Sequence, residues 1–258
     1  MTELPEIELA RGTRVIADLH LDVSGRGEAQ PRERFRVWLA EQRGVPALLI
    51  LGDLFDAWIG PAHLALPAAR GVVEGLAELA ARGTAVHVLH GNRDFLLERR
   101  FEGASGARVH PAGMIGRTPR GDRILFVHGD ELCTADHGYQ RLRAVLRSRP
   151  VRRGVPLVPR WAGLWIARRL RRASVQALGY KPSEEKALQA PAARELAERH
   201  RCRTLVCGHA HEFRDELLPG EVRWLVLDAF GGPAGVLELG PGDRLAPLAA
   251  GGPEAPNP

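Results

Sequence analysis

The stretch PALLILGD (residues 46–53) shows the pattern that decides the fold of this chain: a short apolar run that ends in a Gly-Asp turn. Four other runs have a similar form, namely TRVIADLH (13–20), TAVHVLHGN (84–92), DRILFVHGD (122–130) and RTLVCGHAH (203–211). Short, β-branched-rich apolar runs indicate buried strands that carry polar residues at their carboxyl ends. Residues 33–42 and 69–82 have helical spacing, and Gly83 is typical of a helix stop. Alternating strands and helices predict a layered α/β domain whose ligands gather at the carboxyl ends of the strands.

The composition is that of a globular protein with 258 residues, 45% of them hydrophobic and 26% charged. Its apolar runs are shorter than the roughly 20 residues of a bilayer span, and the acidic first ten residues differ from a signal peptide. We therefore expect a cytoplasmic protein. Cys133, Cys202 and Cys207 form no CxxC pair, which favours reduced thiols. The net charge of +5 indicates an anionic partner, which could be nucleic acid, a membrane surface or a phosphorylated substrate.

Positive charge is concentrated in residues 141–172, which contain eleven arginines and no acidic residue. Trp161 and Trp165 are interleaved with arginines in this window, as in an amphipathic helix with tryptophan on its apolar side. The final residues are rich in Gly and Pro, which is typical of disorder. The predicted organisation is a core of residues 1–138 and 191–250, a helical insertion of residues 139–190 and a disordered tail of residues 251–258.

Polar side chains that can bind metals lie at the ends of all five predicted strands. They are Asp18, His20, Asp53, Asn92, His128, His209 and His211. Oxygen and imidazole ligands without cysteine suit Mn²⁺, Fe or Zn²⁺ better than Ca²⁺. Two such ions about 3.5–4 Å apart can clamp a phosphoryl group and lower the pKa of a bridging water, and one carboxylate must then bridge the ions.

The spacing of these residues supports a shared site. Residues two apart on an extended segment, as we expect for Asp18 and His20 and for His209 and His211, point to the same side. A glycine precedes Asp53, Asn92 and His209, and we expect it to let each turn bend sharply near the ions.

Each motif alone also fits a structural role. Asp18 could cap a strand end, Asp53 could be a turn residue after glycine, and Asn92 could be a left-handed turn residue. His128 and His209 could be structural histidines. Together, however, five coincidences at five strand ends favour the metal interpretation.

The motifs DxH, GD, GN, a strand-end His and GHxH resemble those of the calcineurin-like metallophosphoesterase superfamily over residues 14–235. Within it, the strings IADLHL, LGDLFDAWIG, HGNRDFLL and HGDELCTADHGYQ are similar to those of the UDP-2,3-diacylglucosamine hydrolases of lipid A biosynthesis. The resemblance implies a four-layer αββα metallophosphoesterase sandwich with a helical cap insertion and two Mn²⁺ or other divalent ions per chain. It also implies water attack on the α-phosphate of UDP-2,3-diacylglucosamine, which yields UMP and 2,3-diacylglucosamine 1-phosphate (lipid X).

The resemblance assigns roles to individual residues. One ion would be held by Asp18, His20, Asp53 and His211, and the other by Asp53, Asn92, His128 and His209, so that Asp53 is the bridge. Catalytic roles would fall to Asp53, Asn92, Arg93 and His128. Substrate contacts would come from Asn92, Arg93, Asp136, Ser174, Lys181 and His209. At position 178, four residues after Ser174, this chain has Leu178 where the family has asparagine.

Arg93 stands where other members of the superfamily have histidine. A fixed guanidinium can hold a diphosphate oxygen bidentately and stabilise its charge without donating a proton. The alternative is an Arg93 that pairs with Asp94 or Asp130 and only stiffens the loop.

The caps of this family cover acyl chains, so the resemblance implies an acylated UDP-sugar lipid as substrate. Trp161, Trp165 and the basic face would then suit peripheral association with the cytoplasmic face of the anionic inner membrane. Alternatively, the two tryptophans only pack the cap onto the core. No nucleic acid and no obligate protein partner are expected.

Three other functions are compatible with parts of the sequence. One is a phosphoesterase for a different nucleotide diphosphate, and another is a nuclease that tracks phosphates with its basic window. The third is a metal-free binding module, which should have lost ligands, whereas all seven are present here.

Overall fold

The computed structural model describes residues 3–25, 27–58, 60–154 and 187–248. The five predicted strands are all present, as β2 (Arg14–Ile16), β3 (Ala47–Ile50), β4 (Ala85–Leu89), β7 (Arg123–Phe126) and β8 (Thr204–Cys207). The other strands are β1 (Glu6–Glu8), β5 (Arg108–His110), β6 (Met114–Arg117), β9 (Arg214–Leu218), β10 (Val222–Val226), β11 (Val236–Leu239) and β12 (Leu245–Pro247). The helices are α1 (Gln30–Glu41), α2 (Pro67–Ala81), α3 (Arg99–Ser105), α4 (His137–Leu146), α5 (Arg149–Gly154) and α8 (Ala190–Arg199). Short 3₁₀ helices are η1 (Pro61–Ala65), η2 (Asp130–Leu132) and η4 (Pro241–Asp243).

The strands form two six-stranded mixed sheets, with the orders β1-β6-β7-β8-β10-β9 and β12-β11-β2-β3-β4-β5. Strands β2, β3, β4 and β5 run parallel to one another, and β7 runs parallel to β8. Parallel neighbours end at the same edge of a sheet, so the polar residues after each of these strands are delivered to a common edge.

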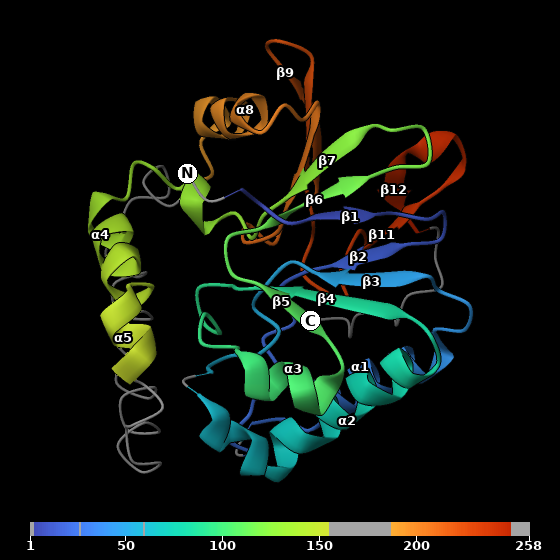
Figure 1. Cartoon of the computed structure of the whole chain (residues 1–258), viewed down its shortest axis with the longest axis vertical. Helices are drawn as coiled ribbons and strands as arrows, with labels where there is room; N and C mark the ends of the chain where they lie inside the picture. Colours follow the sequence, from blue (N-terminus) through green and yellow to red (C-terminus); the bar gives the residue numbers. More distant parts are fainter. Residues whose placement is uncertain (1–2, 26, 59, 155–186, 249–258) are drawn as a thin grey trace.

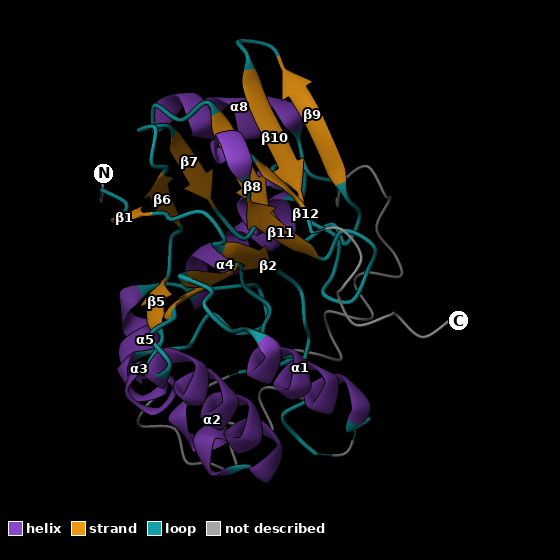
Figure 2. Cartoon of the chain, turned by 90° about the vertical axis from the view of Figure 1, so that its right-hand side faces the viewer, coloured by secondary structure: helices purple, strands orange, loops and turns teal. Residues whose placement is uncertain are grey.

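Alternate residues of the central strands pack on different layers. Leu48 and Ile50 of β3 lie in one core cluster with Val72 of α2, whereas Leu49 lies in a second cluster with Phe126 of the other sheet. A third cluster joins that other sheet to α8. The layers are therefore α1, α2 and α3, then the two sheets, then α8 (Figures 1 and 2). This arrangement confirms the predicted αββα sandwich and explains why the central strands are apolar on both faces.

The helix boundaries follow the local sequence closely. Helices α1 and α2 begin at Gln30 and Pro67, slightly before the predicted starts, because a proline at the first helical positions is already set for the helix. Helix α2 ends as predicted: Gly83 has a φ of +95°, and its amide donates to the carbonyl of Ala80 at 3.0 Å.

Part of the predicted cap lies outside the described residues, as do Trp161, Trp165, Ser174, Leu178 and Lys181, and the predicted tail. The described beginning of that region is helical, and α4 starts at His137, two residues before the predicted boundary. No helix in the described ranges combines the length and the apolarity needed to cross a membrane. The three cysteines are buried thiols outside any disulfide in the described structure, which agrees with the expected reduced state.

Candidate metal centre

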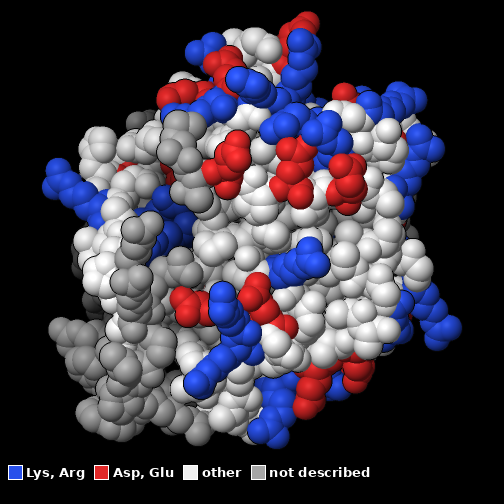
Figure 3. All heavy atoms as spheres, viewed as in Figure 1, with Lys and Arg blue, Asp and Glu red and all other residues white. Residues whose placement is uncertain are grey.

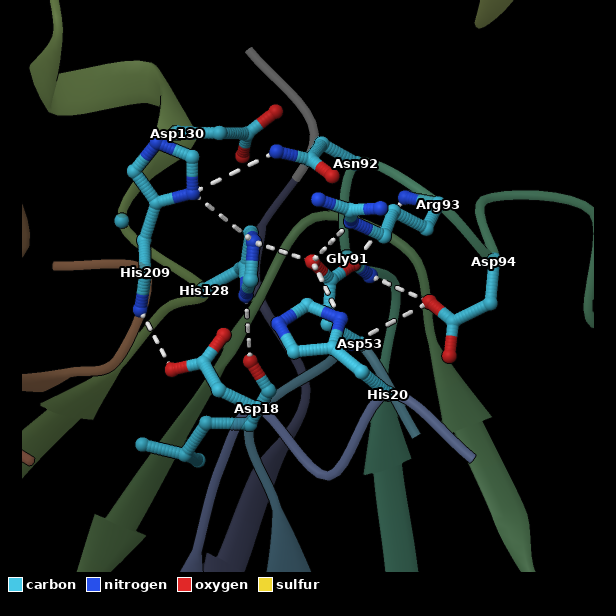
Figure 4. Close-up of polar contacts among 12 residues, drawn as sticks. Asp18, His20, Asp53, Gly91, Asn92, Arg93, Asp94, His128, Asp130 and His209 are labelled. Carbon is cyan, nitrogen blue, oxygen red and sulfur yellow. Dashed lines mark hydrogen bonds and ion pairs between the residues drawn. The ribbon is translucent and has the colours of Figure 1, made fainter. Parts of the chain in front are cut away.

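The seven predicted ligands converge on one site, although they follow five strands of both sheets. Figure 4 labels all of them except His211. Asp18 and His20 follow β2, Asp53 follows β3 and Asn92 follows β4 in one sheet. In the other sheet, His128 follows β7, and His209 and His211 follow β8. Asp18, Asp53 and His128 are buried, and His211 is the most exposed of the seven.

The backbone at this edge is left-handed at five of the seven ligands. The φ angles are +56° at Asp18, +49° at His20, +51° at Asp53, +71° at His209 and +55° at His211. The expectation of extended DxH and HxH segments is therefore wrong. The chain after β2 instead bonds to the chain after β3, with the His20 amide donating to the Asp53 carbonyl at 2.9 Å. Such conformations cost about 1–3 kcal/mol per residue and concentrate at functional sites.

The glycines at the site serve two different needs. Gly52 has a φ of +95°, as expected for a sharp turn. Gly91 and Gly208 are not left-handed, and they allow close approach instead. A Cβ on Gly91 would lie 2.0 Å from the Asp53 Oδ1, and one on Gly208 would lie 2.5 Å from the Asp18 Oδ2. The predicted bend thus applies at Gly52 but not at the other two glycines.

Both aspartates use one oxygen for the backbone and present the other to the site. Asp18 Oδ2 accepts the His209 amide at 2.7 Å, and Asp53 Oδ1 accepts the Arg93 amide at 2.9 Å. Asp18 Oδ1 lies 3.6 Å from His211 Nε2. Asp53 Oδ2 lies 3.6 Å from His20 Nδ1 and 3.9 Å from His128 Nε2, so it is the oxygen between the two groups of ligands.

The histidines are oriented by neighbouring groups. The Nδ1–H of His128 donates to the Leu51 carbonyl at 2.8 Å, which leaves Nε2 as the metal-binding nitrogen. That Nε2 is 3.3 Å from His209 Nδ1, and His20 Nε2 is 3.0 Å from His211 Nε2. Asn92 presents its Nδ2 to His209 Nδ1 at 3.4 Å, so its amide must turn over to present the oxygen that the sequence predicted as a ligand.

These separations fit bound cations. Ligand atoms about 2.1 Å from an ion are about 3.0–3.4 Å apart in octahedral or tetrahedral geometry, close to the distances observed here. Asp18 Oδ1 and His20 Nδ1 are also buried without a hydrogen-bond partner in the described structure, which is costly unless another group binds them. The groups Asp18, His20, His211 and Asp18, Asp53, His128 each place their ligand atoms within 4.8 Å of one another. The residues therefore fit a divalent metal site.

The charges of the site are strongly coupled. Burial raises the pKa of Asp53 to about 7. Burial opposes protonation of His128, but Asp53 and Asp18 raise its pKa to about 9. Burial and nearby positive charges lower the pKa of His20 to about 3 and that of His209 to about 4. The metal-free site thus retains a proton near Asp53 and His128, where metal binding would displace it.

Arg93 lies beside the bridging position. Its Nε is 3.6 Å from Asp53 Oδ2, and its side chain is 28% exposed. Asp94 accepts four backbone amides instead, those of Gly91, Asp53, Leu54 and Phe55. The structure therefore shows neither Asp94 nor Asp130 as the ionic partner of Arg93, because Asp130 pairs with Arg143 and Arg147.

The interactions of Asp130 were not predicted from the sequence, and they engage two arginines of the basic window. Arg143 and Arg147, which belong to the basic window, point inward to Asp130. The missed signal is the spacing of Tyr139, Arg143 and Arg147, which lie four residues apart and hence on one helical face. Asp136, predicted to contact substrate, caps α4 by accepting the Tyr139 amide at 2.8 Å.

Comparison with known proteins gives one family. Residues 13–213 match the family model described as calcineurin-like phosphoesterase. A UDP-2,3-diacylglucosamine hydrolase of Ralstonia nicotianae is 39% identical over 83% of this chain and 82% of the relative. The enzyme of that name from Chromobacterium violaceum is 36% identical over 90% of this chain and 97% of the relative. A dimetal phosphatase from Danio rerio has a TM-score of 0.44 and 15% identity, and it covers 84% of this chain and 87% of that one. With a family model that spans most of its length, this chain belongs to the calcineurin-like phosphoesterases and is a hydrolase.

Proposed function

We propose that this chain hydrolyses the diphosphate of UDP-2,3-diacylglucosamine to UMP and 2,3-diacylglucosamine 1-phosphate. Water would attack the α-phosphate at a centre of two divalent ions, with Mn²⁺ as the expected metal. The observation that supports this most is the convergence of the seven ligands on one site, in which Asp53 Oδ2 lies near His20, His128 and Arg93. The names of relatives that cover most of the chain support the choice of substrate.

We assign the ligands to the two ions from the side-chain atoms that the hydrogen bonds of the protein leave unoccupied. Asp18, His20, Asp53 and His211 would hold one ion, and Asp53, Asn92, His128 and His209 the other. Asp53 Oδ2 would bridge the ions, because Oδ1 is occupied by the Arg93 amide. When bound, the two ions would lower the pKa of a water and offset the charge on the phosphates.

Arg93 would bind the diphosphate. Its backbone amide donates to Asp53 Oδ1, while the Nε of its partly exposed guanidinium lies 3.6 Å from Asp53 Oδ2. This guanidinium would therefore be available to an anionic substrate oxygen when the carboxylate of Asp53 binds metal. Such a contact stabilises charge on a phosphate leaving group, which departs as an anion and needs no proton.

Asp136, Ser174, Lys181 and His209 are proposed as further substrate contacts. Asp136 is 9% exposed and caps the helix α4 next to the site. We further propose peripheral binding to the cytoplasmic face of the inner membrane, from which the acylated substrate would be drawn.

A nuclease activity has less support. Figure 3 shows one face of the molecule, on which basic and acidic side chains of the described residues are interspersed without a continuous basic stripe. Two arginines of the basic window are also engaged with Asp130 and so are not available for phosphate tracking.

The test is UMP release by purified protein with Mn²⁺, measured on UDP-2,3-diacylglucosamine and on UDP-N-acetylglucosamine in parallel. We expect turnover of the acylated substrate and little of the other. Equal rates would refute the lipid specificity, and the absence of turnover of either would refute the proposed reaction. In H₂¹⁸O, attack on the α-phosphate places the label in UMP, whereas label in the sugar phosphate would contradict it.

A further inference from the structure

Asp130 is a buried carboxylate that binds three side chains of the α4 segment. It lies two residues after His128 and is 0% exposed. Its Oδ2 accepts the Tyr139 hydroxyl at 2.7 Å, the Arg143 Nε at 2.7 Å and the Arg147 Nη2 at 3.0 Å. One carboxylate oxygen thus joins the segment after β7 to three positions of one helical face.

The same network reaches the turn after β4. The Nη2 of Arg147 also donates to the Gly91 carbonyl at 3.2 Å, immediately before the predicted ligand Asn92. On the other side of the network, the Gln140 side chain donates to the main-chain carbonyl of Asp130 at 2.8 Å. Helix α4 is therefore connected to the chain segments that carry Asn92 and His128, which Figure 4 shows beside Asp130.

Apolar burial contributes little to the position of α4. None of its ten residues is fully buried, and Leu142 and Val145 are 47% and 59% exposed. Only Leu146, at the carboxyl end, packs partly buried against a core cluster. The charged side of the helix faces the core, which reverses the usual orientation of an amphipathic helix. Its placement therefore depends mainly on charge-assisted hydrogen bonds to Asp130, and removal of one partner leaves a buried charge uncompensated.

We propose that Asp130 is a positioning residue that holds α4, through Arg143 and Arg147, against the Gly91–Asn92 turn and so sets the KM for the acylated substrate. This inference rests on the proposed function. Asp136 lies at the amino end of α4, so a displaced helix would move this predicted substrate contact away from the metal ligands. The ligands themselves come from strand ends and would keep their places.

The test compares Asp130→Asn with Asp215→Asn, a matched control. Asp215 also pairs with an arginine, accepting from Arg223 at 2.8 and 2.7 Å, but it lies on β9 outside the metal centre. Metal content and kinetics are measured with UDP-2,3-diacylglucosamine and with bis(4-nitrophenyl) phosphate, a small diester that lacks sugar and acyl chains. Amide hydrogen exchange of residues 137–146 is measured in parallel.

For Asp130→Asn we expect the KM of the acylated substrate to rise about tenfold, equivalent to about 1.4 kcal/mol. Activity on the small diester and metal content should stay near wild type, exchange in α4 should rise, and the control should show none of these changes. Arg147→Ala, whose side chain is already partly exposed, should give the same pattern if Asp130→Asn does not fold. The double variant should be no worse than the poorer single variant.

An unchanged KM and unchanged exchange in both variants would overturn the proposal. Equal losses on the two substrates would also overturn it, because Asp130 would then support the metal ligands and not α4. If the wild-type protein releases no UMP from the acylated substrate, the proposed function fails. The exchange measurement still decides in that case whether Asp130 holds α4.

Discussion

Asp94 should contribute more to stability than any surface carboxylate of similar geometry, although no metal or substrate role is assigned to it. Its Oδ1 accepts the amides of Gly91 at 2.8 Å and Asp53 at 3.3 Å, and its Oδ2 accepts those of Leu54 at 2.8 Å and Phe55 at 3.3 Å. Because the carboxylate is 0% exposed, water cannot replace it. Asp94→Asn turns one acceptor oxygen into a donor that faces amides.

The loss of stability follows from the shorter of the two hydrogen bonds that the replaced oxygen accepts. A hydrogen bond to a charged group contributes about 1.5–3 kcal/mol, and a buried amide left without a partner costs a similar amount, so we expect a loss of about 3 kcal/mol in the free energy of unfolding. For a chain of this size, that corresponds to a decrease in Tm of about 6–12 °C.

Thermal and urea unfolding of the metal-free proteins measure this effect. The control is Asp22→Asn, because Asp22 also accepts two loop amides, those of Ser24 at 3.0 Å and Gly27 at 2.9 Å, but is partly exposed. We expect the control to lose about 1 kcal/mol. If Asp94→Asn were no less stable than Asp22→Asn, the four hydrogen bonds to Asp94 would not contribute to the free energy of unfolding as expected from their burial.

Three further predictions concern the metal ligands, the arginine and a second histidine pair. Asp53→Asn removes the charge between the two proposed ions, so UMP release should fall at least about 1000-fold and bound metal should decrease; retention of both metal and turnover would contradict the bridge. Arg93→Ala should lower UMP release about 100-fold with metal content unchanged. Arg93→Lys should partly recover the activity. Turnover and affinity near wild type in Arg93→Ala would exclude a substrate contact. His87 Nδ1 lies 2.9 Å from His110 Nε2. Burial and the charge of His110 lower the pKa of His87 from 6.5 to about 4. Burial also lowers the pKa of His110. The unfolded chain therefore takes up protons first, and the free energy of unfolding should decrease as the pH falls from 6.5 towards 4. Urea titrations should show a smaller decrease in His87→Gln, and an unchanged slope would show that the pair does not control acid stability.

The layered core and the chemistry of the site could be predicted from sequence because both depend on short patterns. Each apolar run is buried on two faces and ends in a polar turn, so PALLILGD indicates both a strand and a residue at its end. The types of the seven ligands then limit the metals that the site can bind. These features involve neighbours in the chain, and the structure places all seven ligands together.

Other features of the site could not be predicted from local patterns. The left-handed backbone at Asp18 and His20 replaces the extended segment expected from their spacing. Arg143 and Arg147 look like part of a basic surface in the sequence, but the structure turns them towards Asp130.

The sequence by itself determined five strands of the core and the side chains that can bind metal. Only the tertiary structure decided which atoms are free to do so. Asp18 Oδ2 is occupied by an amide 191 positions away, and Asp94 accepts an amide 40 positions away. The first of these hydrogen bonds forms only once the two sheets meet, and the second only once β3 and β4 pair within one sheet. Residues so distant in the chain leave no periodic signal in the sequence.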